Sequence, residues 1–376
     1  MRFFTNLTLL LSSLMLCHGY YLDVSCDKKQ QAVVEKWVKN AVDLASAALT
    51  TLRFLEDAAG VDEKLLGPVC TASNELMKTL FRRVLTNNRV DASNERYKEI
   101  KSRFEKIIHH DPQRNGVPEV TPPNLNVPNN PSHDLPPVER QADRFKHLFS
   151  EDLVIYCDYS RFEEGRTCGA IENPTSACDT STGVTVDIDS WYTECKNSLT
   201  SDSKWSSWVQ PLAPGPRQIQ LCPGYLSRAS DRHYQVLEDI RHALTVTAFE
   251  PPHDHPLLPE FEPYEADGEV VQGDVTPPVQ YAYLGDAIML EAMLKALRPE
   301  GMDPIRTEQE PVGWIKARAA GRRLDGGTSR SASHNVYYAI GSKLSIAPAG
   351  GQLLTIMKTS GRFTYLYPPE PGDLTV

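Results

Sequence analysis

Residues 28–55 carry a single apolar face over a long stretch, and this pattern restricts the fold more than any other feature of the sequence. Apolar side chains recur at steps of three and four positions, at Val33, Trp37, Ala41, Leu44, Ala48, Leu52 and Leu55. This spacing predicts a long amphipathic helix whose apolar side packs against other elements. The same periodicity predicts helices at about 74–85 and 93–108.

The second half of the chain mixes strand and helix signals. Short apolar runs at residues 153–156 and 219–221 predict strands, and the Gly-, Cys-, Ser- and Thr-rich residues between them indicate disulfide-tied loops. Helices are expected at 231–249, 281–297 and 331–345, and a β-hairpin at 352–357 and 363–367. Together these patterns predict an α+β fold that is predominantly helical, with a small sheet and disulfide-tied loops.

The first nineteen residues have the layout of a secretory signal. Arg2 precedes an apolar run over residues 7–17, and Cys17 and Gly19 supply small side chains before a cut after residue 19. No apolar stretch of the sequence reaches the eighteen residues typical of a membrane-spanning helix. The net charge of −10 opposes binding to nucleic acid or an anionic membrane. The sequence therefore predicts a secreted, extracellular protein.

Seven cysteines follow the signal-like segment, at positions 26, 70, 157, 168, 178, 195 and 222. In an oxidising compartment most of them should form disulfides, although the spacing does not give the connectivity. Because seven is an odd number, at least one thiol stays free or pairs between chains.

The expected organisation is continuous after the signal at 1–19. Residues 20–110 form the N-terminal helical part of one domain, and 111–138 a proline-rich insertion or linker. Residues 139–345 complete the domain, and 346–376 form a C-terminal hairpin extension.

Most motifs of catalytic sites are missing from the sequence. It has no GxSxG, no phosphate-binding Gly-Lys-Ser/Thr loop and no GxGxxG. None of the ten histidines is directly followed by a glutamate, so the His-Glu-x-x-His zinc helix is also absent. That motif places two imidazoles on one helix face beside a glutamate that activates the metal-bound water.

The segments around such a helix nevertheless occur in order. An alanine-rich helix after Cys26 is followed by Leu80-Phe81, by the predicted helix from Tyr97, by Tyr156-Cys157-Asp158, and by Ile219-Gln220-Leu221-Cys222-Pro223. In this order the chain resembles the secreted fungal deuterolysin-type aspzincins and the related lysine-specific metallo-endopeptidases. The resemblance implies a zincin-like metallopeptidase domain in which the strand ending in Cys-Pro precedes the zinc helix.

The positions that match the family's catalytic groups carry other residues. The zinc helix matches at residues 242–246, where His242 is the first ligand, Ala243 replaces the base and Val246 replaces the second ligand. The family's third ligand, an aspartate, matches Pro278, and its tyrosine matches Tyr281. The terminal helix of the family matches residues 331–339. The resemblance therefore implies a vestigial zinc site from which no metal cofactor is expected.

Several residues allow an alternative interpretation. Glu238 and His242 lie four positions apart and could present two ligands on one helix face, with His253 or His255 completing a zinc site. The simpler interpretation is an ordinary polar pair on a helix, with the two later histidines in a solvated loop.

Three further features carry both a structural and a functional interpretation. Tyr281 is a buried aromatic residue or faces a reacting carbonyl, and His334 is a surface histidine of a helix or an isolated base. A basic run is a solvated face or a docking patch; it comprises Arg318, Arg322, Arg323 and Arg330.

The favoured hypothesis is a secreted pseudopeptidase that acts by binding an unidentified extracellular protein. The alternatives are an active zinc endopeptidase that uses Glu238, His242 and His253 or His255, and a structural protein without a functional cleft.

Overall fold

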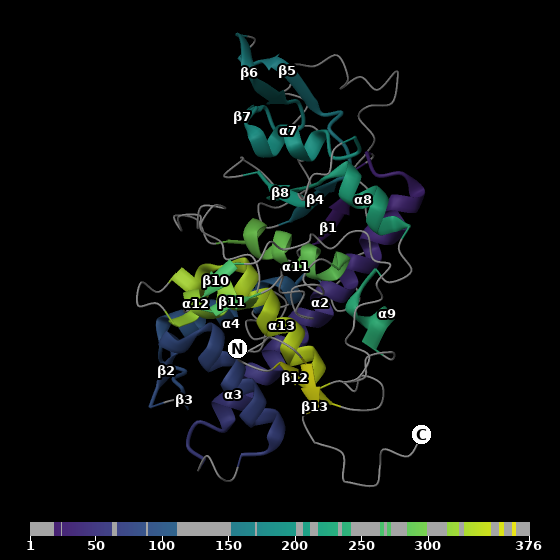
Figure 1. Ribbon diagram of the computed structural model, residues 1–376. Helices are drawn as coiled ribbons and strands as arrows, with labels where there is room; N and C mark the ends of the chain where they lie inside the picture. The colour runs from purple at the N-terminus through teal and green to yellow at the C-terminus, as the bar shows by residue number, and fades with distance from the viewer. Residues whose placement is uncertain are drawn as a thin grey trace, which may run out of the picture.

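The computed structural model describes sixteen stretches of the chain. They are residues 19–23, 25–61, 66–87, 89–110, 152–169, 171–200, 206–210, 217–231, 235–241, 264–266, 269–271, 284–298, 314–322, 327–346, 353–356 and 363–365. Figure 1 labels the helices and strands by the names used below.

The predicted long helix is present as α2, which spans Lys28–Asp57. Asp27 caps its N-terminus, because the Asp27 side chain accepts the backbone N–H of Gln30 and the Gln30 side chain accepts that of Asp27. The side chains at the predicted apolar positions are buried, Trp37 and Leu52 completely. This helix is the axis of the core.

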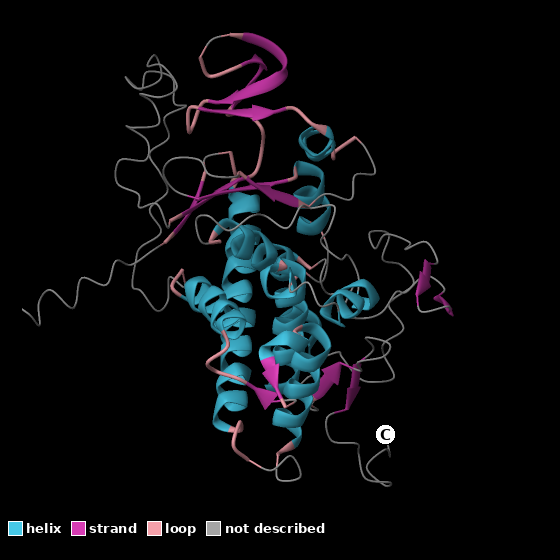
Figure 2. Cartoon of the chain, turned by 90° about the vertical axis from the view of Figure 1, so that its left-hand side faces the viewer, coloured by secondary structure: helices cyan, strands magenta, loops and turns pink. Residues whose placement is uncertain are grey.

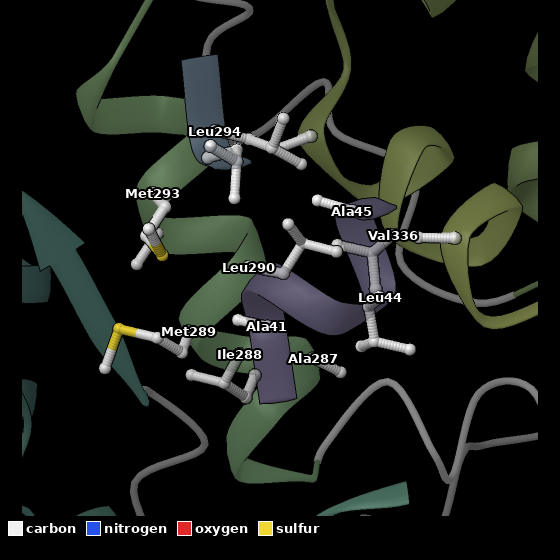
Figure 3. Packing of buried hydrophobic residues seen from close by; sticks show 14 of the residues in the cluster. Ala41, Leu44, Ala45, Ala287, Ile288, Met289, Leu290, Met293, Leu294 and Val336 are labelled. Atoms are coloured by element: carbon white, nitrogen blue, oxygen red, sulfur yellow. The ribbon is translucent and has the colours of Figure 1, made fainter. Parts of the chain in front are cut away.

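Five further helices form the helical half of the molecule with α2. They are α3 (Pro68–Leu80), α4 (Glu95–Ile108), α11 (Gly285–Ala296), α12 (Trp314–Arg322) and α13 (Ala332–Ile346). Helices α3, α4, α11 and α13 all contact α2, and α12 contacts α3 and α13. Figure 3 shows Ala41 and Leu44 of α2 beside Leu290 of α11 and Val336 of α13. Helix α11 is buried on nearly every side, as a helix in the middle of a core must be.

A four-stranded sheet covers one end of the helices (Figure 2). Its strand order is β1 (Tyr20–Leu22), β4 (Leu153–Tyr156), β9 (Arg217–Leu221) and β8 (Ser207–Val209). The first three strands are parallel and the edge strand β8 is antiparallel. Because side chains alternate along a strand, Ile155, Ile219 and Leu221 face the helical core, whereas Tyr156, Gln218 and Gln220 face the other way.

A smaller sheet lies beyond the first, at the top of Figure 1. It consists of β5 (Phe162–Arg166), β6 (Glu172–Asp179) and β7 (Val184–Asp187), and α7 (Ser190–Lys196) follows it. Aromatic rings join this layer to β8: Trp208 lies 5.9 Å from Phe162 and 4.7 Å from Trp191, measured between ring centroids. The molecule thus has three layers, which are helices, a mixed sheet and a small antiparallel sheet.

Short elements complete the described chain. They are η2 (Arg82–Val84), β2 (Leu85–Thr86), β3 (Arg89–Val90), α8 (Pro223–Ser230), α9 (Leu237–Arg241), β10 (Tyr264–Ala266), β11 (Glu269–Val271), η6 (Gly327–Arg330), β12 (Leu354–Ile356) and β13 (Phe363–Tyr365). Strands β12 and β13 pair antiparallel, which confirms the predicted C-terminal hairpin.

Three disulfides cross-link the described part of the chain. Cys26–Cys157 joins the start of α2 to the end of β4, Cys168–Cys178 ties β6 to the loop after β5, and Cys195–Cys222 joins α7 to the start of α8. Cys70 is the free cysteine of the described residues, as an odd number requires. Burial and nearby Asp57 raise the pKa of its thiol.

The structure confirms a mixed α+β, predominantly helical fold with small sheets and disulfides, and corrects three local predictions. The helix expected at about 74–85 spans Pro68–Leu80, and η2 and β2 follow it at residues 82–86. The helix expected from residue 231 starts only at Leu237, and a separate helix, α8, ends before it at Ser230. The loops expected between β4 and β9 contain the sheet β5–β6–β7. The proline-rich segment 111–138 lies outside the described residues. Among the described helices, none combines the length and apolarity needed to cross a membrane.

Candidate functional site

Most residues of the predicted vestigial zinc site lie outside the described part of the chain. This applies to His242, Ala243, Val246, His253, His255, Pro278 and Tyr281. The segments on either side of these residues are described. Helix α9 ends one residue before His242, and α11 begins four residues after Tyr281.

These two flanking segments lie together, although they are far apart in the sequence. The backbone N–H of Gly285 donates to the carbonyl of Gln235 at 2.8 Å, and the backbone N–H of Leu237 donates to Asp286 Oδ2 at 2.9 Å. The segment that leads into the first predicted motif, at residues 242–246, therefore lies beside the segment that follows the second, which contains Pro278 and Tyr281.

Asp286 is the chemically unusual residue at this junction. Its side chain is 1% exposed, and its two oxygens accept the backbone N–H groups of Leu237 and Ala287, both at 2.9 Å. Burial raises the pKa of this carboxyl to about 7, because desolvation outweighs the two backbone donors. Asp286 is a buried acid that holds α9 against α11. No local sequence pattern indicates its burial, because that burial depends on a contact with Leu237, 49 positions away.

A second carboxylate fixes the start of α9 to α2. Asp239 accepts the backbone N–H groups of Gln235 and Val236, and Lys36 Nζ lies 2.8 Å from its carboxylate. Although partial burial acts to raise its pKa, the hydrogen bonds from Lys36 and the backbone lower the pKa of Asp239. Asp239 thus stays charged at neutral pH and anchors the first turn of α9.

The close approach of α11 to α2 depends on a glycine. An added Cβ at Gly285 would lie 2.1 Å from the indole ring of Trp37, far inside van der Waals contact. Trp37 is completely buried and also packs against Tyr225 of α8, with ring centroids 5.7 Å apart. Glycine at 285 therefore lets the start of α11 pack directly against Trp37 of α2.

Glu238, the acidic member of the alternative zinc site, is on the first turn of α9. Its side chain is half-buried and engaged in interactions within the protein. In the described residues, no cluster of three or more His, Cys, Asp and Glu side chains is close enough to hold a metal ion.

His334 is the predicted site residue that the structure corrects most clearly. It was expected at the surface, but its side chain is completely buried on α13. Its Nδ1 lies 2.9 Å from Ser331 Oγ and its Nε2 lies 2.8 Å from the carbonyl oxygen of Ala317. Burial lowers its pKa to about 4, so the ring is neutral and both nitrogens are occupied. His334 is a structural residue that joins α13 to α12.

The basic run does not gather into one described patch. Arg330 is exposed, and its Nε lies 3.6 Å from Glu99 Oε1. Arg318 is half-buried and interacts with other groups of the protein. The side chain of Arg322, and Arg323 as a whole, lie outside the described part.

Neither a family model, nor a curated protein, nor a solved structure matches this chain. The likeness to the aspzincins therefore stays a prediction from the sequence motifs.

Proposed function

We propose that this chain is a secreted, non-catalytic relative of the aspzincin metallo-endopeptidases that acts by binding a protein partner. The observation that carries the proposal is the identity of three residues, Ala243, Val246 and Pro278, at the positions of the base and two zinc ligands. The junction of α9 with α11 supports the pairing of the two motifs, because it brings their flanks together.

The chemistry of these three side chains explains the expected loss of activity. Neither valine nor proline has a side-chain atom that coordinates zinc, and alanine cannot accept a proton. A structural zinc site is worth about 10–16 kcal/mol, so each of four ligands contributes roughly 3 kcal/mol. Losing two ligands then weakens zinc binding by about four powers of ten. Losing the base costs on the order of 10²–10⁴ in rate.

Secretion is the cellular context in which this proposal makes sense. The three disulfides are typical of an oxidising compartment, and the first nineteen residues have the layout of a signal. The surface that would have held substrate in an active relative then remains as a site for an extracellular protein.

Restoring the missing groups tests the motif assignment. We expect the triple variant Ala243→Glu, Val246→His, Pro278→Asp to bind zinc in equilibrium dialysis, whereas the wild-type chain binds less than a tenth as much. The matched control carries Val246→Ala in place of Val246→His. Because it lacks one of the three ligands, it should bind zinc about two powers of ten more weakly than the triple variant. A triple variant that folds but binds no zinc would show that residues 242–246 and 278 do not form one site.

Partner binding is tested separately from metal binding. The proposal predicts an extracellular protein whose capture by the wild-type chain is lost on Tyr281→Ala and kept on Tyr281→Phe. A partner that both variants retain would place the binding surface elsewhere. Stoichiometric zinc in the wild type, with chelator-sensitive hydrolysis of casein, would instead favour the active endopeptidase that uses Glu238 and His242.

A further inference from the structure

The interface between the two sheets contains polar side chains that are almost completely buried. Gln218 and Gln220 project from β9 on the side away from the helical core, where Val154 and Tyr156 of β4 lie beside them in register. Gln210, which follows β8, is the neighbour of Gln218 across the strands, and its backbone N–H donates to the Gln218 carbonyl at 3.3 Å. A buried glutamine pair on one face of a sheet is unusual, since glutamine is mostly exposed.

The small sheet β5–β6–β7 supplies the opposite wall. Arg161 precedes β5, and its guanidinium lies over the Tyr156 ring at 3.6 Å from the centroid. Arg161 Nε donates to Asp179 Oδ2 at 3.1 Å, and Arg161 Nη1 donates to Gln220 Oε1. Near the other end, Gln210 Nε2 donates to Thr182 Oγ1 at 3.4 Å. Polar bonds therefore connect the two sheets at both ends of this row.

Four polar atoms within the same row have no hydrogen-bond partner among the residues that the structure describes. They are Arg161 Nη2, Gln210 Oε1, and both Nε2 and Oε1 of Gln218. The residues are only 4%, 5% and 1% exposed, so bulk solvent does not reach these atoms. Buried polar groups in folded proteins are almost always paired, because an unpaired one loses its hydration without compensation.

The kind of ligand that fits follows from the charges and from the mixture of donors and acceptors. Asp179 neutralises Arg161 directly, so the row needs no additional ion. Arg161 Nη2 and Gln218 Nε2 require acceptors, while the carbonyl oxygens of Gln210 and Gln218 require donors. A neutral molecule that donates and accepts at once satisfies both requirements, and water does so with two to four polar partners.

We infer that the interface between the two sheets contains a site for bound water, a small internal cluster held by Arg161, Gln210 and Gln218. The cluster completes the polar connection between β9 and the small sheet, beside the aromatic contact of Trp208 with Phe162. Water in this position bridges polar groups of the two sheets by hydrogen bonds that are nearly as favourable as direct ones.

The direct test is a crystal structure of the mature wild-type chain at a resolution that shows ordered solvent. The inference predicts electron density for water within hydrogen-bonding distance of Arg161 Nη2 and of the Gln218 amide. An interface with no density at these atoms, or one in which other protein groups pair with them, overturns it.

A stability measurement tests the same inference in solution. Gln218→Met keeps the length of the side chain and removes its amide. If water satisfies the amide, the variant loses those hydrogen bonds and its urea midpoint falls below that of the wild type. If the amide is bare, the substitution removes an unpaired polar group and the midpoint rises, which contradicts the inference.

Discussion

Asp286 and His334 are two buried titratable groups whose effects on stability oppose each other. Burial raises the pKa of Asp286 from an ordinary 3.8 to about 7 and lowers that of His334 from an ordinary 6.5 to about 4. Between about pH 4.5 and 6 the folded chain therefore holds a proton on Asp286 and none on His334. The unfolded chain holds a proton on the histidine and none on the aspartate.

The signs follow from this difference in bound protons. Asp286 binds its proton more tightly in the folded state than in the unfolded state. Its stabilising contribution to the free energy of unfolding is therefore fully present below pH 4 and is lost as the pH rises through 7. His334 resists protonation in the folded state, so its contribution is full above pH 6.5 and is lost as the pH falls to 4. Each group alone changes the free energy of unfolding by about 1.4 kcal/mol per pH unit in this window. Together they cancel.

Single substitutions should reveal the two opposing slopes. In Asp286→Asn only the His334 effect remains, so we expect the free energy of unfolding to rise by about 2 kcal/mol from pH 4.5 to 6 relative to the wild type. In His334→Gln only the Asp286 effect remains, and stability should fall by about the same amount. The double variant should follow the wild-type pH dependence again.

Urea unfolding with the disulfides intact, monitored at pH 4.5, 5.25 and 6, provides the measurement. Subtraction of the wild-type curve removes the contribution of the other carboxylates, which all variants share. If Asp286→Asn gave a curve parallel to that of the wild type, Asp286 would not titrate as a buried acid, and its role in joining α9 to α11 would need another explanation.

Further predictions concern packing and covalent links. Gly285→Ala should lower the free energy of unfolding by about 1–3 kcal/mol, because the added Cβ would lie 2.1 Å from the Trp37 ring. The control Gly60→Ala, which has open space around it, should change the free energy of unfolding little. Equal effects of the two variants in thermal unfolding would contradict the close approach of Gly285 to Trp37. Leu290→Ala, at a completely buried position beside α2, should cost about 2–5 kcal/mol in urea unfolding. Removing the disulfide Cys26–Cys157, which joins residues 131 positions apart, should lower the free energy of unfolding by about 5 kcal/mol through chain entropy. Removing Cys168–Cys178, with a separation of 10, should lower it by about 3 kcal/mol. A lower denaturation midpoint for the second variant than for the first would refute the entropic account.

The helices and inner strands could be predicted because their local patterns agree with their tertiary contacts. In α2 the apolar positions recur at helical spacing, and these residues form the core. Strand β4 is a continuous apolar run buried on both faces.

Other elements have only weak or non-periodic sequence signals. Strand β6 contains Pro174 and is exposed over its first half, so its sequence has no strand-like alternation. Helix α8 begins with Pro223 at its first position, which is a helix-start signal that the sequence does contain. The burial of His334 also had a signal, since apolar residues occur on every side of α13, the pattern of a fully buried helix.

The junction of the candidate site could not be predicted from local sequence. Asp286 looks like an ordinary acidic residue in the first turn of a helix, where a negative charge is common and usually exposed. Its buried state arises only in the folded chain, where α9 docks on α11 and the backbone N–H of Leu237 donates to its carboxylate. Disulfide connectivity is equally a property of the fold, because spacing alone leaves many pairings open.

The zinc content of the wild-type chain tests the central claim most directly. The purified, secreted protein, loaded with excess zinc and then desalted, should carry less than about 0.1 zinc per chain by mass spectrometry of the metal, since Val246 and Pro278 offer no ligand atoms. One zinc per chain, lost on His242→Ala, would contradict the claim and identify a working metal site where a vestigial one is proposed.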